Sequence, residues 1–413
     1  MSKARHRALK EALRKVLEEV EPVLRGTSGR PLASEAEISE AVRASYDEIR
    51  ALPSVAQARD ILLGSSLSED VRRNLLYEYP DDSGRDWGAV IQARVLRPFI
   101  EFVLIAGSDQ FERVYGHFED FLSSSIMEIS DIAHLRNFES EVELIQLSES
   151  ACIRKFSEPE HRDIVRTIFT MDPSAQIENR YLSKDQFGIE LRDTIQKSLD
   201  REIPHKFAID PNQVLWALRL FKSGRVYYNI VISYEHDWLY KTGPRRSSRS
   251  RGWAKRQPSW DRYVLGSAEV KEFLNLWDQV KKVDLAKEDL ALKRFEAGLA
   301  RRDPKESLIE FMIAFENLLG IGAQELKFRM ATNLAWFLGK DYTERRQMYR
   351  TFNDGYDLRS DIVHGRKRFR KKKFEDPARL QALVKKLEGY LRTTILKILL
   401  DGKPDWEQII FQG

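Results

Sequence analysis

Two residues near the end of one expected helix, Arg359 and His364, have side chains that could act together on a phosphate ester. Arginine stays charged and donates hydrogen bonds in a planar fork that matches phosphate oxygens. Histidine changes its charge near neutral pH, so it can act as a general acid or base. Gly365, a residue type that suits a left-handed helix cap, follows directly. The spacing therefore predicts that both side chains lie at the C-terminal end of the helix.

The helix expected over residues 342–364 has an apolar stripe, and Arg359 falls in the middle of it. A guanidinium directed at a core or an interface is costly unless it is paired or used. The guanidinium therefore needs an acidic partner or an anionic ligand. The stripe consists of Tyr349, Phe352, Tyr356 and Val363.

Glu316 offers such a partner, because it lies within the apolar side of the helix expected over 305–319. An inward glutamate and an inward arginine on neighbouring helices could hold each other in place. This pairing is commonly only a structural ion pair, and a histidine before a glycine is commonly only a helix cap. Because His364 lies about one turn from Arg359, a functional interpretation competes with both structural ones.

A strongly basic segment begins directly after Gly365, and seven of its eight residues are basic. Such a segment suits a phosphate backbone, and binding to it would weaken with salt. The alternative is a solvated charged loop. Residues 241–256 form a second positive stretch, whose Gly, Pro and Ser content predicts a mobile loop that either guides RNA or is simply exposed. The candidate RNA-binding residues are Arg366, Lys367, Arg368, Arg370, Lys371, Lys372 and Lys373, with Arg245 and Arg246 in the second stretch.

The apolar patterns predict a mainly α protein with a mixed α+β middle region and a C-terminal helical bundle. Residues 3 to about 135 have helical spacing, and the strongest strand is expected at 226–234. Bundle helices are expected near 267–282, 285–300, 305–319, 323–338, 342–364 and 376–401. The predicted domains are a helical domain of unknown role over 1–137, an α+β domain over 138–266, the bundle over 267–401 and a tail over 402–413.

Composition restricts the possible function classes. The 413 residues carry a net charge of +4, so the distribution of charge matters more than its sum. Because Cys152 is the single cysteine, no intramolecular disulfide can form, which is typical of proteins in a reducing compartment. We expect Cys152 to be a small apolar residue of the core. The early apolar run at 99–107 is too short for a membrane span, so we expect a cytoplasmic protein without a membrane partner. No P-loop motif or metal-binding histidine pair occurs, so we expect no cofactor and no metal.

The segment Leu358-Arg-Ser-Asp-Ile-Val-His-Gly365 resembles the Arg-x4–6-His motif of HEPN domains, specifically the ApeA-like branch found in bacterial defence proteins. The resemblance is clear over about 285–400 and fainter back to about 140, whereas residues 1–135 match nothing that we can name. Many catalytic HEPN motifs carry Asn, Asp or His directly after the arginine, and here Ser360 stands there. Further matching segments, in the order of that branch, are Arg294-Phe295, Arg302-Asp-Pro304, 309–319, 325–330 and 356–359.

The resemblance implies a metal-independent endoribonuclease (a hydrolase) whose bundles pair as a homodimer. His364 would be the acid–base group, Arg359 would bind the scissile phosphate, and Glu316 would be the polar residue of the earlier helix. It also implies a toxin-like or antiviral role, with a phage-derived or cellular trigger. The alternative is a non-catalytic HEPN protein that binds RNA or a nucleotide, or scaffolds a partner, and Ser360 favours it. A DNA-binding regulator is disfavoured, because no helix-turn-helix signature is present.

Overall fold

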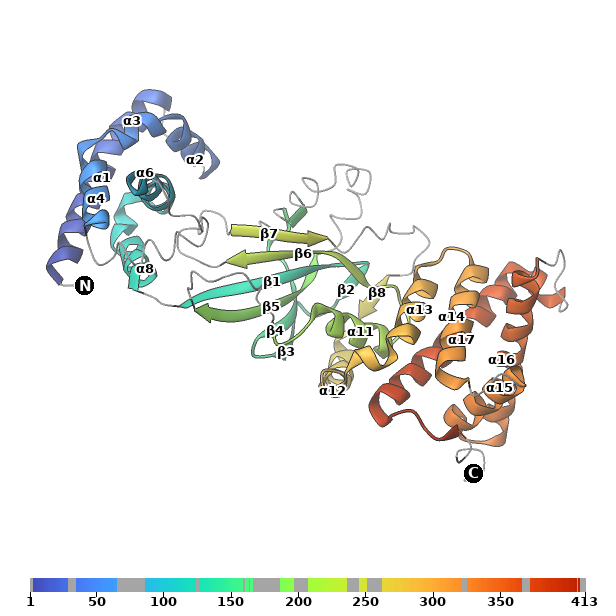
Figure 1. Ribbon diagram of the computed structural model, residues 1–413. Helices are drawn as coiled ribbons and strands as arrows, with labels where there is room; N and C mark the ends of the chain where they lie inside the picture. The colour runs from blue at the N-terminus through green and yellow to red at the C-terminus, as the bar shows by residue number, and fades with distance from the viewer. Residues whose placement is uncertain are drawn as a thin grey trace. The chain divides into compact units, whose positions relative to one another are not determined.

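The computed structural model separates the chain into two compact units, formed by residues 1–132, 191–207 and 232–248, and by residues 133–190, 208–231 and 249–413. Helices dominate, and strands occur in the middle of the sequence (Figure 1), which confirms the predicted mainly α class. The structure describes residues 3–28, 35–64, 86–123, 126–158, 160–162, 164–165, 186–196, 207–235, 245–250, 262–320, 325–365, 372–406 and 408.

The first unit buries the apolar stripes of its N-terminal helices against one another. A π-helical turn over Gln92–Leu96 joins two of them just before Pro98. The N–H of Arg97 bonds to the carbonyl of Gln92, five residues earlier, as in a π-helix. The α-helices are α1 (Lys3–Ser28), α2 (Glu35–Ala44), α3 (Tyr46–Arg50), α4 (Pro53–Leu63), α6 (Trp87–Ile91), α7 (Arg97–Ala106) and α8 (Phe111–Ser123).

The strands form a six-stranded sheet of order β3-β4-β5-β1-β6-β7 and a pair, β2 and β8, that run parallel. β3 and β4 pair in antiparallel fashion, and Cys152 on β4 is buried as predicted. The strands are β1 (Ile126–Arg136), β2 (Phe138–Ser140), β3 (Leu144–Ser148), β4 (Ala151–Lys155), β5 (Phe187–Gln196), β6 (Tyr227–Glu235), β7 (Arg245–Ser250) and β8 (Tyr263–Leu265).

Two expectations about local structure were wrong. β1 lies in a region that we predicted to be helical. Its apolar residues recur at every third position, which resembles helical spacing: Ile126, Ile129, Ile132 and Leu135. Strand alternation is absent because the polar residues among them, such as Ser130, are buried too. β7 lies in the predicted loop 241–256. Its Arg- and Ser-rich sequence has low strand propensity, so its pairing with β6 defines it as a strand.

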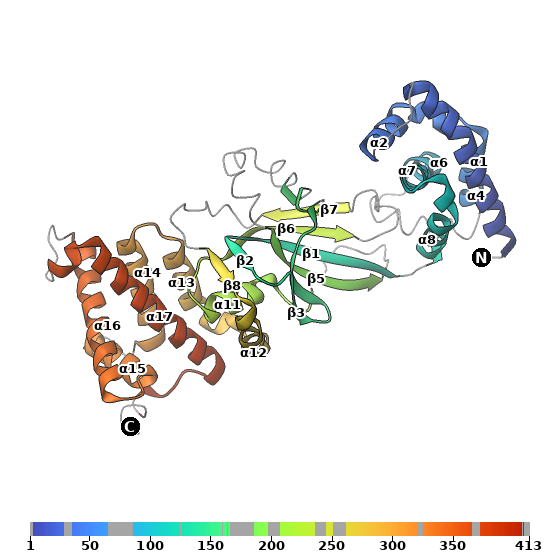
Figure 2. The same ribbon diagram turned by 180° about the vertical axis from the view of Figure 1, so that it is seen from behind.

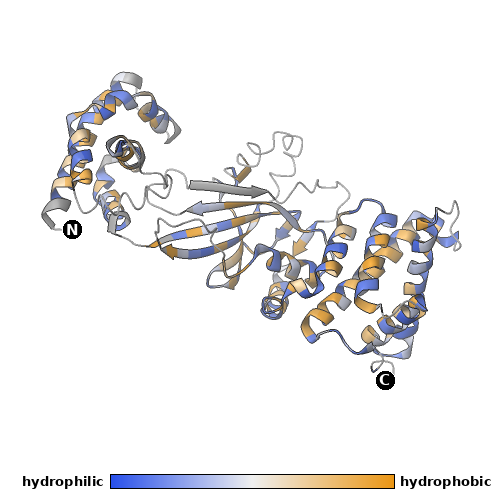
Figure 3. Cartoon of the chain, in the orientation of Figure 1, coloured by the Kyte–Doolittle hydropathy of each residue, from blue (hydrophilic) through white to orange (hydrophobic). Residues whose placement is uncertain are grey.

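The C-terminal helices match the predicted ones to within a few residues. In three of them an aspartate accepts a backbone N–H at the helix start: Asp303, Asp341 and Asp376. Figures 1 and 2 show the bundle from two sides, and Figure 3 shows polar and apolar faces on its helices. The helices are α12 (Val270–Val280), α13 (Asp289–Ala300), α14 (Pro304–Leu319), α15 (Leu326–Leu338), α16 (Tyr342–Val363) and α17 (Pro377–Asp401).

Two buried arginines attach α11 (Pro211–Phe221) to this bundle within the second unit. Arg219 of α11 donates from Nη1 to Oε1 of Glu296 at 2.9 Å, which links α11 to α13. Arg392 of α17 donates from Nε to the carbonyl oxygen of Arg219 at 2.8 Å. The Arg392 guanidinium also lies over the ring of Phe295, 5.8 Å from its centroid. The helix that precedes β6 is therefore bonded to both α13 and α17.

None of the described helices is long and apolar enough to cross a membrane.

Glu310 joins α13 and α14. Its carboxylate, buried on α14, accepts hydrogen bonds from Nη1 of Arg294 at 3.0 Å and from Nη2 of Arg301 at 2.8 Å. Burial opposes its ionisation, but the two guanidinium contacts outweigh burial and lower the pKa of Glu310. The ionised carboxylate therefore stabilises the packing of α13 against α14.

We expect Glu310→Gln to destabilise the fold by about 1–2 kcal/mol at pH 7, because hydrogen bonds to a charged group are lost beside half-exposed arginines. The contribution of a carboxylate whose folded pKa is lowered is complete above its unfolded pKa of about 4.3 and disappears as the pH falls through the folded value. Thermal unfolding should give a lower Tm for Glu310→Gln than for the wild type at pH 7, and the difference in Tm should disappear in acid. A difference that increased below pH 4 would contradict the assigned role of the Glu310 carboxylate.

Candidate functional site

The end of α16 forms the cap that the sequence predicts. The N–H of His364 bonds to the carbonyl of Ser360, and the N–H of Gly365 bonds to the carbonyl of Ile362, both at 3.0 Å. Gly365 adopts a φ of 61°, the left-handed region in which glycine has no steric penalty. α16 thus stops at His364, and this side chain lies at the negative end of the helix dipole.

One face of α16 is fixed in the bundle core. Phe352 is fully buried and meets Phe315 of α14 edge-on, with ring centroids 5.3 Å apart. A Cβ at Gly355 would lie 2.5 Å from Cδ1 of Leu387, so α16 and α17 approach each other closely at this point. These contacts determine how α16 is rotated about its axis, and thus where Arg359 points.

The predicted apolar stripe is divided between this inner face and a second, outer face. Phe352 belongs to the core, whereas Tyr349 and Tyr356 are half-buried and Val363 is 54% exposed. Phe328 of α15 is 55% exposed, and its ring packs edge-on against Tyr349 with centroids 6.3 Å apart. Tyr349, Tyr356 and Val363 recur at seven-residue intervals, and we call these three residues with Phe328 the outer face. Tyr349 and Tyr356 also pack against the bundle core, so this apolar surface is only partly exposed.

Arg359 and Glu316 are close together, as their positions in the two stripes predict. Nη2 of Arg359 lies 3.6 Å from Oε1 of Glu316, which is an ionic contact rather than a hydrogen bond. The two side chains remain 27% and 28% exposed. Nε of Arg359 is buried and has no hydrogen-bond partner in the described part of the chain. The guanidinium is therefore oriented by a carboxylate but has unused capacity to bind an anion.

The imidazole of His364 is exposed, and among the described residues it carries neither a hydrogen bond nor an ion pair. It lies five residues after Arg359, about 1.4 turns along α16, so within one chain the two side chains leave the helix on different sides. An open imidazole and an incompletely bonded guanidinium are the residue types that suit an anionic ligand that undergoes proton transfer.

The basic segment is only partly covered by the structure. Residues 366–371, which include Arg366, Lys367, Arg368, Arg370 and Lys371, lie outside the described residues, as do the side chains of Arg245 and Arg246 on β7. Lys372 and Lys373 are exposed at the start of the 3-10 turn Lys372–Glu375. Nζ of Lys373 lies 2.7 Å from Oδ2 of Asp354 on α16, a contact that the sequence pattern did not predict.

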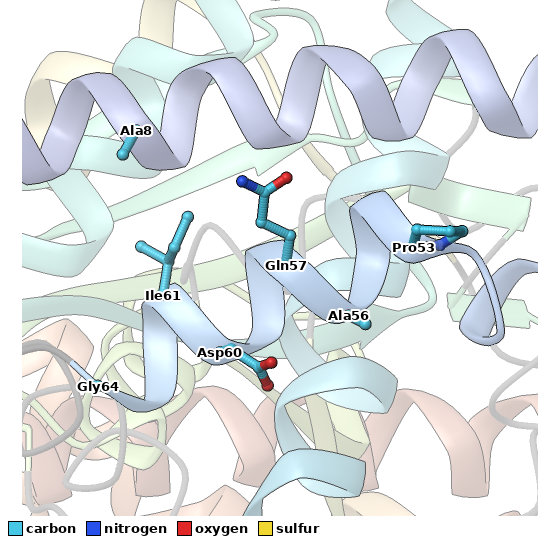
Figure 4. A pocket seen from close by; sticks show the side chains of 7 residues that line it. All are labelled: Ala8, Pro53, Ala56, Gln57, Asp60, Ile61 and Gly64. Carbon is cyan, nitrogen blue, oxygen red and sulfur yellow. The ribbon is translucent and has the colours of Figure 1, made fainter.

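A second polar cluster lies in the second unit, where Arg154 bonds to both Glu160 and Glu190 and the rings of His134 and His161 lie 6.2 Å apart. A groove of about 730 Å³ between α1 and α4 in the first unit is lined by Ala8, Gln57, Asp60 and Ile61, among others (Figure 4), and no histidine or arginine lines it. Within the described ranges, no three His, Cys, Asp or Glu side chains lie close enough to hold a metal ion.

Comparisons of the chain with protein-family models, with curated proteins and with solved structures each find no match.

The orientation of α16 makes a direct prediction about stability. Phe352→Ala should destabilise the protein by about 3–5 kcal/mol, because it removes a fully buried ring and leaves a cavity beside Phe315. Leu290→Ala is the matched control, since Leu290 on α13 is 47% exposed and should change stability by no more than about 0.5 kcal/mol. Urea unfolding measures both changes. Equal losses for the two variants would show that the packing of α16 is wrongly assigned.

Proposed function

We propose that this protein is a HEPN-type endoribonuclease that cleaves RNA without a metal ion, with Arg359 and His364 as its catalytic residues. The observation that carries the proposal is the guanidinium of Arg359, whose side chain is 27% exposed and whose Nε has no hydrogen-bond partner among the described residues. The nearby carboxylate of Glu316 orients this guanidinium at ionic distance without saturating it. The resemblance of residues 358–365 to the HEPN motif supports the same conclusion.

The chemistry needs only the groups that the site provides. RNA carries its own nucleophile, the 2′-hydroxyl. A base removes the 2′ proton, the 2′ oxygen forms a bond to phosphorus, and the bond from phosphorus to the 5′ oxygen breaks as an acid protonates that oxygen. Arg359 would stabilise the additional charge on the phosphorus oxygens. The products are a 2′,3′-cyclic phosphate and a 5′-hydroxyl, and DNA remains uncut.

A single chain supplies only one His364, whereas the reaction needs a base and an acid at the same phosphate. The outer face supports a solution to this requirement. Its seven-residue spacing is that of a helix seam that packs against another helix, and tyrosine is enriched at protein interfaces. We propose that two copies pair across the outer face, which ends at Val363 beside His364. A homodimer would then bring two histidines and two arginines into one cleft.

A non-catalytic protein of the same family is the second candidate, and Ser360 is the residue that favours it. A serine hydroxyl donates one hydrogen bond, whereas an asparagine amide in that position donates two and can orient a phosphate or the histidine. If Ser360 does not support catalysis, the same Arg359 site would bind RNA or a nucleotide, or a partner would cover it. A cytoplasmic, toxin-like or anti-phage role, released by a phage-derived or cellular trigger, belongs to the proposal by resemblance alone.

His364→Ala should reduce RNA cleavage at least 100-fold, the smaller end of what a general acid–base group contributes. Arg359→Lys keeps the charge but loses the planar fork, and should also reduce cleavage. The control is His117→Ala on α8, which replaces another exposed histidine outside the bundle. Labelled total RNA, incubated in excess chelator, provides the assay, and the cyclic phosphate end is detected directly.

Three outcomes of this experiment would count against the nuclease. Equal cleavage by wild type and His364→Ala would indicate a contaminating enzyme. Cleavage that required added magnesium would contradict the mechanism. RNA binding by the wild type without any cleavage would favour the non-catalytic candidate.

The pairing of two copies is tested separately. Val363→Asp should convert the dimer to monomers and abolish cleavage, because it places a carboxylate on the outer face at the expected seam. Leu290→Asp changes a similarly exposed leucine on α13 (47% against 54% for Val363) and should remain dimeric. Sedimentation velocity gives the mass, and Tyr349→Asp repeats the test farther from the catalytic residues. A wild-type protein that cleaves RNA while strictly monomeric would refute the shared cleft.

A further inference from the structure

The N-terminal half of α16 carries an exposed row of side chains that the candidate catalytic site does not use. Tyr342, Arg346 and Arg350 follow one another at four-residue intervals, so their side chains are neighbours on the helix surface. Tyr342 is 74% exposed, and both arginines are exposed as well. We call these three residues the α16 row. Cations beside an open aromatic ring are the combination with which proteins bind single-stranded nucleic acid.

The two arginines of the α16 row are not engaged by the rest of the bundle. Within the part of the chain that the structure describes, Arg346 and Arg350 make no hydrogen bond, ion pair or ring contact. The neighbouring Arg345 differs, because its guanidinium carbon lies 3.7 Å from the centroid of the Trp336 ring and its Nε donates to the carbonyl of Gly339 at 3.1 Å. Arg345 therefore stabilises the connection between α15 and α16, whereas the row arginines have their donors available for an anion.

The α16 row lies on the side of the helix from which His364 projects. Arg346 and His364 are eighteen residues apart, which is five full turns, so both side chains leave α16 in the same direction, about 27 Å from each other. Arg350 lies about 21 Å from His364 along the axis and about 40° round the helix from that line. A strand that followed this side of α16 would therefore meet the row several nucleotides away from a phosphate at His364.

The proposed seam between two copies leaves this side of α16 open. Arg350 directly follows Tyr349 of the outer face, and His364 directly follows Val363. Successive residues of an α-helix are about 100° apart, so Arg350 and His364 are both turned away from the outer face by that angle. Pairing of two copies across the outer face is therefore compatible with a strand bound along the row.

One carboxylate lies on the same side between the row and His364. Asp357 is seven residues from both Arg350 and His364, which is close to two full turns in each direction. Nζ of Lys327 on α15 lies 2.5 Å from Oδ1 of Asp357. A phosphate that passed this point would meet an ion pair rather than a lone carboxylate, so the repulsion is reduced.

We propose that the α16 row binds single-stranded RNA several nucleotides from the cleaved phosphate, so that the strand runs along α16. This inference rests on the proposed function. Arg346 and Arg350 bind phosphates through their guanidinium groups, and a base stacks on Tyr342. The row thus contributes affinity for long strands, whereas a dinucleotide bound at the catalytic residues is too short to reach it.

Binding measurements in the uncleaving His364→Ala background test this inference. The double variant Arg346→Gln with Arg350→Gln and its parent are titrated with fluorescein-labelled oligouridines of increasing length, from the dinucleotide upward, over a salt series. The double variant should raise the Kd for long strands about 2- to 30-fold, the combined effect of two exposed ion pairs, and the loss should grow with strand length. The salt slope should fall by about 1.4, since each phosphate contact of a single strand contributes about 0.7.

Tyr342→Ala separates stacking from charge. It should raise the Kd for long single strands about fivefold or more, because a base loses its aromatic partner. It should not change the Kd for an RNA duplex, whose bases are already stacked on one another. An equal loss for single strands and duplexes would contradict the assigned stacking role.

The matched control is Arg329→Gln, which removes another exposed arginine without a partner among the described residues. Arg329 is two positions after Lys327, so it leaves α15 on the side away from Asp357. A rise in Kd equal to that of the double variant would mean that only net charge matters. That result, an unchanged Kd in the double variant, or a loss independent of strand length would overturn the inference.

The test does not depend on cleavage. Length-dependent binding through the row by a wild type that never cuts RNA would leave this inference standing and remove the nuclease proposal. The absence of RNA binding in both the wild type and the His364→Ala protein would remove both. Circular dichroism confirms that each variant is folded.

Discussion

The contact between α14 and α16 is the constraint on which the candidate site depends. Phe315 and Phe352 meet in the core, and one residue after Phe315, Glu316 reaches Arg359 at 3.6 Å. The aromatic contact sets the rotation of α16, and this rotation places the guanidinium at the boundary between core and solvent. If Arg359 were deeper, its desolvation would require a tight carboxylate partner. If it were fully exposed, water would weaken its interaction with a phosphate.

Several features of this arrangement were predictable because they depend on local chemistry. Aspartates before Pro304 and Pro377 mark helix starts, and Gly365 marks a helix end with the left-handed φ that its residue type favours. The proximity of Arg359 and Glu316 was also predictable, since each interrupts an apolar stripe on a helix of the same bundle. The roles proposed for these residues come from the resemblance to HEPN domains.

Other features depend on contacts that a helical projection does not contain. The stripe of α16 is wider than the surface that α14, α15 and α17 cover, so the same periodicity includes a fully buried Phe352 and a 54% exposed Val363. β1 was missed because its apolar residues recur every third position, while its polar residues are buried by neighbouring elements. The pairing of Lys373 with Asp354 requires the chain to return to α16 after leaving it at Gly365, and no residue spacing encodes that return.

The charges around α16 indicate how binding and restraint can coexist at one site. Two described cations of this region have an acidic neighbour: Glu316 for Arg359, and Asp354 for Lys373. In water such partly exposed pairs contribute little to folding stability, so their effect on stability alone does not account for the arrangement. Such pairs would instead favour long polyanions over small ones. A small anion can replace only one carboxylate at a time, whereas a nucleic acid strand can replace several and also releases its own counterions. Arg359 and Lys373 would then be partly neutralised in the free protein, and a long polyanion could displace both carboxylates.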